Sequence, residues 1–520
     1  MANMPRIVYG SMAGVILGAV LFIAVVALVK RVILHQIEEQ LTDLKIHASE
    51  TSLDLVSRSV TFHEVSWGDQ NTVGSNTPGS LHIRGVQLKG IRIVPLILRN
   101  ALHARSLIID SGSVEINKNY VRSRSNTSNL IGLSIDSIQI VNVYLAVLND
   151  TALQFHGTVD LMIGGLQIPN VTDMTPWLTS RFDFFNIQLR GLQFHETGSL
   201  YTTDVQKFSV NSVKKSLTID SLTLSPLYGK YEFARKKGKQ TDRITLTIPK
   251  ITVSGIDLSR LKDSVVHILD ISIRNTHLQL FRDKRVAFVP GNDIPLPLEM
   301  ISKRPFTIAI DSVHVHNANI FYEVFPERGF HAGNVSFDKL EATMDHISNH
   351  KYYKNIKQAT LVAHANLQEK GFIKASFTIP YGKRQRYTAV GAITHLPLPL
   401  LNPLVENVAF TRMVSGKLNR LKFKFEYNDL SSAGSILIDY EDLKVQSLTK
   451  EKDATPNEFK SFLLNVLLRN NKGKSVSKEK RTGVIKFERD RQKPIFNLWI
   501  QSILSGLENS VIELPGKNKD

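Results

Sequence analysis

The residues that could bind a metal ion are few and poorly grouped. His314 and His316 lie two positions apart, so a strand would place both on one face, where they could share a metal ion. Two histidines alone make a weak site, because zinc usually takes at least three protein ligands. His346 and His350 have the spacing of one helical turn, but the glutamate of the zinc-protease motif does not follow His346. We therefore predict no metal ion and no other cofactor.

The tripeptide Ile-Asp-Ser occurs four times and could in principle supply a catalytic Asp-Ser pair. Around its last copy, the apolar residues Ile308 and Ile310 lie at even-numbered positions, whereas Val313 and Val315 lie at odd-numbered ones, so the parity of the apolar positions changes. A strand with one apolar face can change parity only at a bulge or a break. Asp and Ser suit that position because both can hydrogen-bond to the freed backbone groups. We therefore predict a structural role. The four copies are Ile109–Ser111, Ile135–Ser137, Ile219–Ser221 and Ile310–Ser312.

Motifs of the common enzyme classes are absent from the sequence. It contains no glycine-rich phosphate loop and no Gly-x-Ser-x-Gly nucleophile elbow. The chain has no cysteine, which excludes disulfides, thiolate metal sites and cysteine nucleophiles. Adjacent carboxylates such as Glu441 and Asp442 are typical of turns and surfaces. We predict that the protein is not an enzyme.

The chain is strongly basic, with 64 Lys and Arg against 47 Asp and Glu and a net charge of +17. Such a balance favours polyanionic partners, either nucleic acid or anionic lipid head groups. An equally good interpretation is that the excess charge is spread over solvated faces. The basic segment Lys472–Arg481 lacks the interleaved aromatic residues of a nucleic-acid site. We therefore expect no nucleic-acid partner.

The N-terminus contains an uncharged apolar segment that is long enough to cross a bilayer. It is bounded by basic residues on both sides, and a bilayer core needs about 20 apolar residues. A signal peptide has a shorter apolar region, of about 7–15 residues. We predict a single-pass membrane anchor over residues 1–30, followed by an amphipathic helix over 31–49. The anchor runs through Ile7, Leu17, Phe22 and Val29.

After the anchor, the period of the apolar pattern changes from 3.6 to 2 residues, which indicates strands. From Lys417 to Tyr427, apolar residues alternate with charged ones, so one face of the sheet is apolar and the other is wet. The predicted strands are Leu81–Ile93, Leu107–Ile116, Ile135–Val147, Ile244–Leu258, Ile271–Leu280, Ile308–Phe321, Lys417–Tyr427, Ser435–Tyr440 and Val484–Phe487. Loops are predicted between them, including Ala234–Arg243. We predict a mainly β fold, built as an elongated, curled, repetitive antiparallel sheet with a few short amphipathic helices.

The chain also repeats itself. The apolar and glycine positions from Ile83 to Leu96 match those from Ile248 to Leu261. After a one-residue gap, the apolar positions of Leu107–Ile116 match those of Ile271–Leu280. Repeated one-sided strands can curl into a trough with an apolar interior, which would suit acyl chains. The expected lining residues are Leu421, Phe423, Phe425, Tyr427, Ile308, Ile310, Val313 and Val315.

Two amphipathic helices are predicted near the C-terminus, one at Asn457–Arg469 and one that begins at Pro494. The apolar stripe of the second helix consists of Phe496, Trp499, Ile503, Leu507 and Val511. Basic residues before the helix, a tryptophan and an apolar face are typical of a helix that lies on a membrane. The other interpretation, which we favour, is that the helix caps the open end of the sheet.

Short motifs span most of the chain. They are Leu81–Val86, Pro95–Leu98, Ser113–Ile116, Gly391–Ile393, Leu401–Leu404, Ser415–Leu418, Ala433–Gly434, Tyr440–Val445 and Arg489–Asp490. In the C-terminal part, Asn-Pro is followed by Ser-Gly and then by Tyr-x-Asp-Leu-Lys-Val. Together these motifs resemble the AsmA-like family of Gram-negative envelope proteins, with the C-terminal motifs the more specific.

The resemblance implies an inner-membrane anchor, a periplasmic bulk, and a taco-like β-groove of the bridge-like lipid-transfer type. It further implies phospholipid binding or transport in outer-membrane homeostasis and biogenesis. Phospholipid or another acyl-chain lipid is the expected partner, together with outer-membrane or other envelope proteins. The alternative is a non-enzymatic scaffold for outer-membrane protein assembly, whose apolar faces would pack shut. We expect a groove region over residues 50–388 and an AsmA-like C-terminal region over 389–520.

Overall fold

The computed structural model describes residues 46–67, 79–92, 94–95, 101–117, 132–149, 152–168, 181–196, 198–302, 306–329, 331–349, 357–381, 386–448 and 479–512. The predicted anchor with Ile7, Leu17, Phe22 and Val29 lies outside them, as do most of the helix predicted over 31–49 and the helix predicted at Asn457–Arg469. Within the described ranges, no helix is long and apolar enough to cross a membrane.

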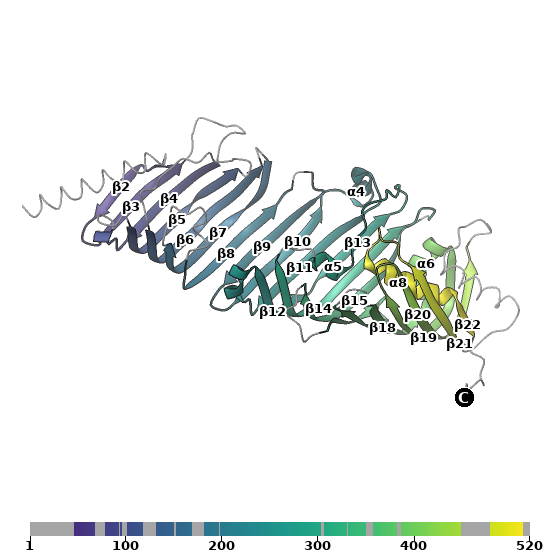
Figure 1. The fold of residues 1–520 in the computed structure, drawn as a ribbon. Helices are drawn as coiled ribbons and strands as arrows, with labels where there is room; N and C mark the ends of the chain where they lie inside the picture. The colour runs from purple at the N-terminus through teal and green to yellow at the C-terminus, as the bar shows by residue number, and fades with distance from the viewer. Residues whose placement is uncertain are drawn as a thin grey trace, which may run out of the picture. The chain divides into compact units, whose positions relative to one another are not determined.

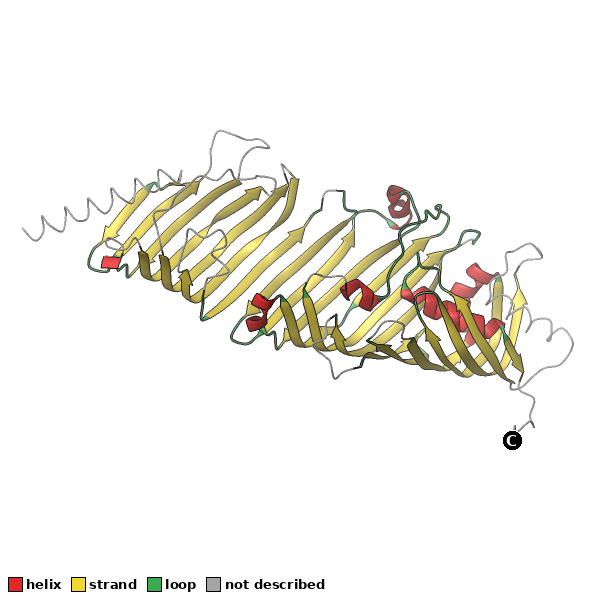
Figure 2. Ribbon diagram, viewed as in Figure 1, coloured by secondary structure: helices red, strands yellow, loops and turns green. Residues whose placement is uncertain are grey.

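The prediction of a mainly β fold is confirmed, because strands dominate and the described helices are short (Figures 1 and 2). The chain divides into two compact units. Unit 1 comprises Met1–Thr197 and Lys207–Val213, and unit 2 comprises Gly198–Gln206 and Lys214–Asp520. The strand β9 (Tyr201–Asn211) contributes residues to both. The expected boundary at residue 388 stays a prediction.

Unit 1 contains strands β1 to β8. Their bounds are β1 Ile46–His47, β2 Glu50–Asp54, β3 Ser59–Trp67, β4 Gly79–Lys89, β5 Ala101–Asn117, β6 Gly132–Asn149, β7 Ala152–Ile168 and β8 Phe184–Phe194. From β2 to β8 each strand pairs with the next, and β1 pairs with β3. Among its described residues, three small buried apolar clusters lie around Val60, Ile83 and Ile135.

Unit 2 contains the remaining strands and the described helices. Its strands are β10 Ser216–Pro226, β11 Asp242–Ser254, β12 Val265–Arg274, β13 His277–Asp283, β14 Thr307–Phe325, β15 Gly333–Ser348, β16 Gln358–Leu367, β17 Gly371–Pro380, β18 Tyr387–Pro397, β19 Thr411–Tyr427, β20 Ser431–Ser447, β21 Glu479–Glu488 and β22 Ser510–Ile512. Its helices are α4 Lys230–Lys237, η1 Leu258–Asp263, α5 Pro297–Ser302, η3 Leu398–Leu401, α6 Asn402–Ala409 and α8 Ile495–Glu508. The main buried cluster of the unit lies where α6 and α8 pack against β16 to β21.

The prediction of a wholly antiparallel sheet is wrong, because the sheet is mixed. Strand β5 pairs in parallel with β6, and β14 pairs in parallel with both β12 and β13. A parallel pair requires a connection that returns the chain to the end where the first strand began. The connection between β13 and β14, residues 284–306, is long enough to do so and contains α5. Local alternation cannot reveal such a return.

Other predicted elements need smaller corrections. The strand predicted over Ile271–Leu280 is divided at Asn275 between β12 and β13, and the loop predicted over Ala234–Arg243 begins inside α4. The strand predicted over Leu81–Ile93 ends at Lys89, because Gly90 adopts a left-handed conformation with φ of 66°. In β19, the alternation predicted from Lys417 to Tyr427 is confirmed, since buried and exposed residues alternate from Leu421 to Tyr427.

The four Ile-Asp-Ser copies coincide with breaks in the strand pairing, as predicted. In two copies the serine is unpaired and left-handed, with φ of 51° at Ser111 and 52° at Ser221. In the other two the aspartate is left out of the ladder, at Asp136 and Asp311. At each break the apolar positions change parity, so the apolar side chains stay on one face.

Rows of unpaired residues also recur in the two units, as the internal repeat predicts. In each row, every strand has a residue that is left out of the pairing, and this residue lies opposite the unpaired residue of the next strand. The first, third and fourth residues of each row have φ between 47° and 56°. The row in unit 1 is Glu64, Arg84, Ser111 and Asn142, and the row in unit 2 is Ser221, Pro249, Asn275 and Asn317. Each copy also contains a parallel pair, so the repeat is longer than the sequence match.

Candidate functional site

A continuous row of apolar side chains crosses unit 2 perpendicular to its strands. Each member is the direct neighbour of the next in the sheet register. Because cross-strand neighbours on one face are close together, the row forms an unbroken apolar track. From β10 to β19 it consists of Leu217, Val253, Ile271, Val313, Met344, Leu361, Phe377, Ala389 and Phe425.

The row is more open at its β10 end than at its β19 end. Leu217, Ile271 and Val313 are half-buried, and no residue of β10 is fully buried. Val253, at 8% exposure, is an exception. At the other end, Ala389 and Phe425 are 0% and 1% exposed. Within the described residues, the apolar face of β10 to β14 is therefore only partly covered.

Helix α8 covers the apolar face at the β19 end. Its Leu498 and Leu507 belong to the same buried cluster as Phe425, and the Trp499 ring stacks on Phe377 with 4.0 Å between centroids. The Ser502 hydroxyl, on the buried face of the helix, hydrogen-bonds to the Ser432 hydroxyl at 2.6 Å. The helix starts one residue later than predicted, with Pro494 as its N-cap.

Three residues of the predicted stripe lie in or against the buried cluster beneath α8. Trp499 and Ile503 pack against the buried cluster and Leu507 belongs to it, but Phe496 is 64% exposed. The described helix therefore lies where the cap interpretation expects it, on the apolar face of the sheet.

The predicted groove-lining residues fall into two groups. Ile308, Ile310, Val313 and Val315 lie on β14 and are half-buried, on the partly open face. Leu421, Phe423, Phe425 and Tyr427 lie on β19 in the cluster that α8 covers, each at most 5% exposed. Burial raises the pKa of the Tyr427 hydroxyl well above its usual range. A cavity of about 170 Å³ remains beside Leu421 and Ile503, with an entirely apolar lining.

Two of the C-terminal motifs have clear roles in this packing. Asn402 binds the backbone of Met413 through both side-chain atoms, with Oδ1 accepting from the Met413 N–H at 2.8 Å and Nδ2 donating to its carbonyl at 2.9 Å. This fixes α6 against the start of β19. At Gly391, a Cβ atom would lie 2.3 Å from the Phe423 ring, so the glycine allows that ring to pack.

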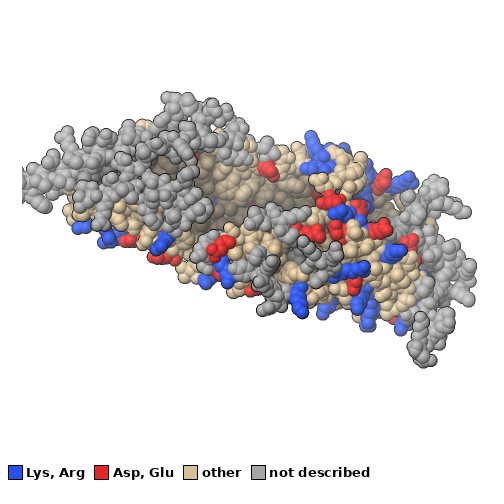
Figure 3. Space-filling view, in the orientation of Figure 1, with Lys and Arg blue, Asp and Glu red and all other residues tan. Residues whose placement is uncertain are grey.

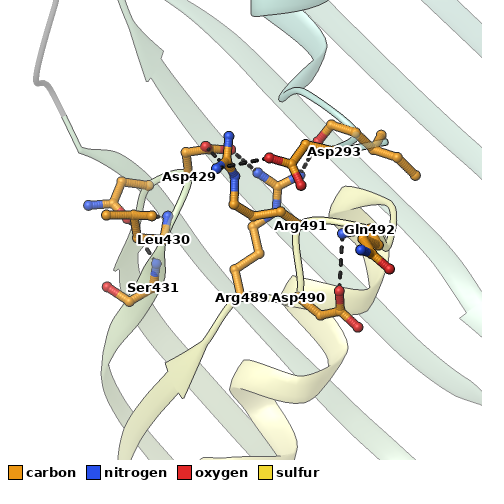
Figure 4. Close-up of polar contacts among 10 residues, drawn as sticks. Asp293, Asp429, Leu430, Ser431, Arg489, Asp490, Arg491 and Gln492 are labelled. Carbon is orange, nitrogen blue, oxygen red and sulfur yellow. Dashed lines mark hydrogen bonds and ion pairs between the residues drawn. The ribbon is translucent and has the colours of Figure 1, made fainter. Parts of the chain in front are cut away.

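A charged cluster fastens the β13–β14 connection to the region around α8 (Figure 4). The Arg489 side chain, 1% exposed, pairs with Asp429 in the β19–β20 turn and donates to the Ile294 carbonyl at 2.6 Å. Arg491 pairs with both Asp429 and Asp293, each at 2.9 Å. The Ile294 N–H donates to the Arg491 carbonyl at 2.7 Å. Asp293 and Ile294 of this connection are thus held against the segment that precedes α8, which itself pairs with the β19–β20 turn.

The sequence motifs contain only part of this cluster. Arg489 belongs to the Arg489–Asp490 motif, whereas its neighbours in the cluster, Asp293 and Asp429, lie in segments without a recognisable pattern. The Asp490 carboxylate does not face Asp429; it accepts from Lys493 at 2.9 Å and from the Gln492 N–H at 3.0 Å. Burial raises the pKa of Asp490, but these donors outweigh it and the net pKa lies below the usual range.

The histidine pair on β14 is engaged with carboxylates. The rings of His314 and His316 stack with 6.0 Å between centroids. His314 lies 3.2 Å from Asp270, and His316 lies 2.9 Å from Glu341. Among the described residues, no group of three or more metal-binding side chains is placed to hold an ion. His346 lies in strand β15 with φ of 61°, and His350 lies outside the described residues.

Comparison with known proteins gives no family. No protein-family model matches the chain, and no curated protein matches it. The resemblance to the AsmA-like family therefore stays a prediction that rests on the motifs.

Proposed function

We propose that this chain is a non-enzymatic, membrane-anchored envelope protein that binds the acyl chains of phospholipids along the apolar face of its sheet. The observation that carries the proposal is the continuous apolar row of unit 2, which is only partly covered over β10 to β14. Soluble monomers rarely leave a large contiguous apolar surface open unless it binds something. At about 25 cal/mol per Å², covering that face with an acyl chain would be favourable.

The geometry of the row suits a long apolar ligand. Adjacent strands lie about 4.8 Å apart, so the row offers a regularly spaced track along which a chain can lie. Unit 1 contains a corresponding row across β3 to β8, formed by Phe62, Val86, Ile109, Ile140, Leu161 and Ile187. In Figure 3 the hollowed surface beside α4, in unit 2, is mostly tan, and charged side chains lie along its edges. These features would fit a periplasmic, taco-like groove that is held by an inner-membrane anchor, as the resemblance to the AsmA-like family implies.

A photo-crosslinking experiment tests the proposal. A benzophenone amino acid is placed in the full chain at Val313, on the apolar face of β14, and as a matched control at His314, on the opposite face of the same strand. After irradiation in cells, we expect phospholipid adducts at Val313 and few at His314. Equal adduct yields at the two positions, or none at Val313, would contradict lipid binding on this face.

The second candidate is a scaffold for outer-membrane protein assembly that carries no lipid. The observation that favours it is the closed end, where α8 packs shut the apolar face of β19 and β20. The same experiment separates the two functions. A scaffold would give protein adducts at exposed positions and no lipid adduct at Val313.

A further inference from the structure

Helix α4 presents a strongly basic surface at the ends of β11 and β13, against which it packs. Only Phe233 and Ala234 of the helix are buried, and the Phe233 ring lies 5.1 Å from that of Tyr201. The helix ends at Gly238, whose left-handed conformation, with φ of 72°, terminates it sharply. Of the other side chains, Tyr231 packs its ring edge-to-face against Phe281, whereas Arg235, Lys236 and Lys237 are exposed.

The outward side chains of α4 are mostly cationic. Arg235, Lys236 and Lys237 occupy its last turn and Lys239 follows, against one acidic residue of the helix, Glu232. Cations at a helix C-terminus are stabilised by the helix dipole, so the arrangement costs little in the folded state. Lys236 lies 5.4 Å from the Tyr228 ring centroid, and Lys230 at the other end of the helix pairs with Glu323.

Exposed apolar side chains lie beside these cations. Leu227 and Tyr231 are 51% and 43% exposed, and Phe288 and Val289 are each 48% exposed. The segment that carries Phe288 runs beside the end of α4, because Gln240 donates to the Ala287 carbonyl at 3.0 Å and to the Lys284 carbonyl at 3.1 Å. We call the combined surface the α4 patch; it consists of Leu227, Tyr231, Arg235, Lys236, Lys237, Lys239, Phe288 and Val289.

We propose that the α4 patch docks on the surface of an anionic phospholipid bilayer. Lysines near such a surface are attracted to the head groups, while aromatic and aliphatic side chains enter the interfacial layer beneath them. An anionic bilayer accounts for both features of the patch, because its head groups attract the cations and its interfacial layer receives the exposed apolar side chains. The proposal goes beyond lipid binding by the sheet, and it stands whether or not the apolar row holds acyl chains.

Vesicle binding by the full chain tests the proposal. The full chain is reconstituted into nanodiscs of zwitterionic phosphatidylcholine. The predicted N-terminal anchor is then already inserted in a bilayer and does not bind the added vesicles. Dense vesicles with or without phosphatidylglycerol are then added and sedimented. We expect binding only to the anionic vesicles, with a loss as salt is raised. At about 1 kcal/mol per lysine, K236Q/K237Q/K239Q should weaken binding on the order of 100-fold.

Two further variants make the test specific. K422Q/K424Q/K444Q removes the same charge from the wet face of β19 and β20, and it should leave binding unchanged. F288S/V289S keeps every charge and should weaken binding several-fold. If both lysine variants lost vesicle binding equally, the binding would depend on net charge alone, and the proposal would be overturned. Binding of polyglutamate with no binding of vesicles would overturn it in favour of an acidic protein partner. Lipid adducts at Val313 are a separate readout that neither result changes.

Discussion

Arg489 is a buried guanidinium at the place where three segments of unit 2 meet. It contacts Asp429 in the β19–β20 turn and Ile294 in the β13–β14 connection, and its own backbone precedes α8. Burying such a charge is unfavourable unless it is paired, and a planar guanidinium can satisfy several acceptors at once. The residue therefore fixes the position of loops that lack regular secondary structure.

Removing the partner of Arg489 should destabilise unit 2. In Asp429→Asn the guanidinium stays buried without a counter-charge, and we expect a loss of about 2–4 kcal/mol in the free energy of unfolding. Thermal unfolding of the full chain measures it. The matched control is Glu426→Gln, whose exposed pair with Arg386 should contribute less than about 1 kcal/mol. Equal changes in the two variants would contradict the role assigned to Asp429.

The Asp283 carboxylate provides a pH-dependent contribution. Its pKa is lowered, chiefly because Arg285 donates to it, with a bond of 2.7 Å from Nη2. A lowered folded-state pKa means that the stabilisation is fully present above the unfolded value, near 4, and is lost as the pH falls below it. The midpoint of thermal unfolding should therefore fall less steeply below about pH 4 in Asp283→Asn than in the wild type. Parallel pH profiles for the two proteins would refute this.

At the scale of the strand, the residues with a left-handed backbone mark the breaks at which the apolar positions change parity. Asn317 has φ of 52°, and its side chain donates to Asn275 at 2.8 Å. A β-branched residue tolerates this conformation poorly, whereas glycine adopts it freely. We expect Asn317→Val to cost about 2–3 kcal/mol and Asn317→Gly less than about 1 kcal/mol, as measured by thermal unfolding.

The repeat supplies an internal check of that expectation. Asn142 occupies the corresponding position in unit 1, with φ of 54°. Asn142→Val should therefore destabilise as Asn317→Val does, while Asn142→Gly is tolerated. If valine were accepted at either position, the break would not depend on the left-handed backbone.

The strands show which features of this fold a sequence can reveal. Alternation from Leu421 to Tyr427 predicted a buried and a wet face because burial acts on each residue locally. The sequence also reveals the parity change around Asp311, since it breaks a period of two. The parallel pairing of β14 was not, because register depends on where a long connection returns the chain. Likewise, nothing local reveals that α8 covers Phe425 while Val313 stays half-buried.

At the scale of the whole chain, one arrangement occurs twice. Each unit has a row of left-handed breaks and a parallel pair, and each carries an apolar row across its strands. The breaks keep successive apolar side chains on one face although the strands change parity. Each unit therefore carries an apolar surface of the kind on which the proposed lipid binding depends.

The closed end beneath α8 should open when the helix is weakened. Leu498 is 1% exposed and Leu507 is 6% exposed, and truncating two such leucines to alanine removes roughly 4 kcal/mol or more of packing. In the wild type, a benzophenone side chain at Tyr427 should yield no lipid adduct, because α8 occupies the face. In L498A/L507A the adduct should appear, while adducts at Val313 stay unchanged. The control is F496A/I500A, which truncates two exposed side chains of α8 and should give no lipid adduct at Tyr427. A lipid adduct at Tyr427 in the wild type would mean that α8 leaves this face and is no fixed cap.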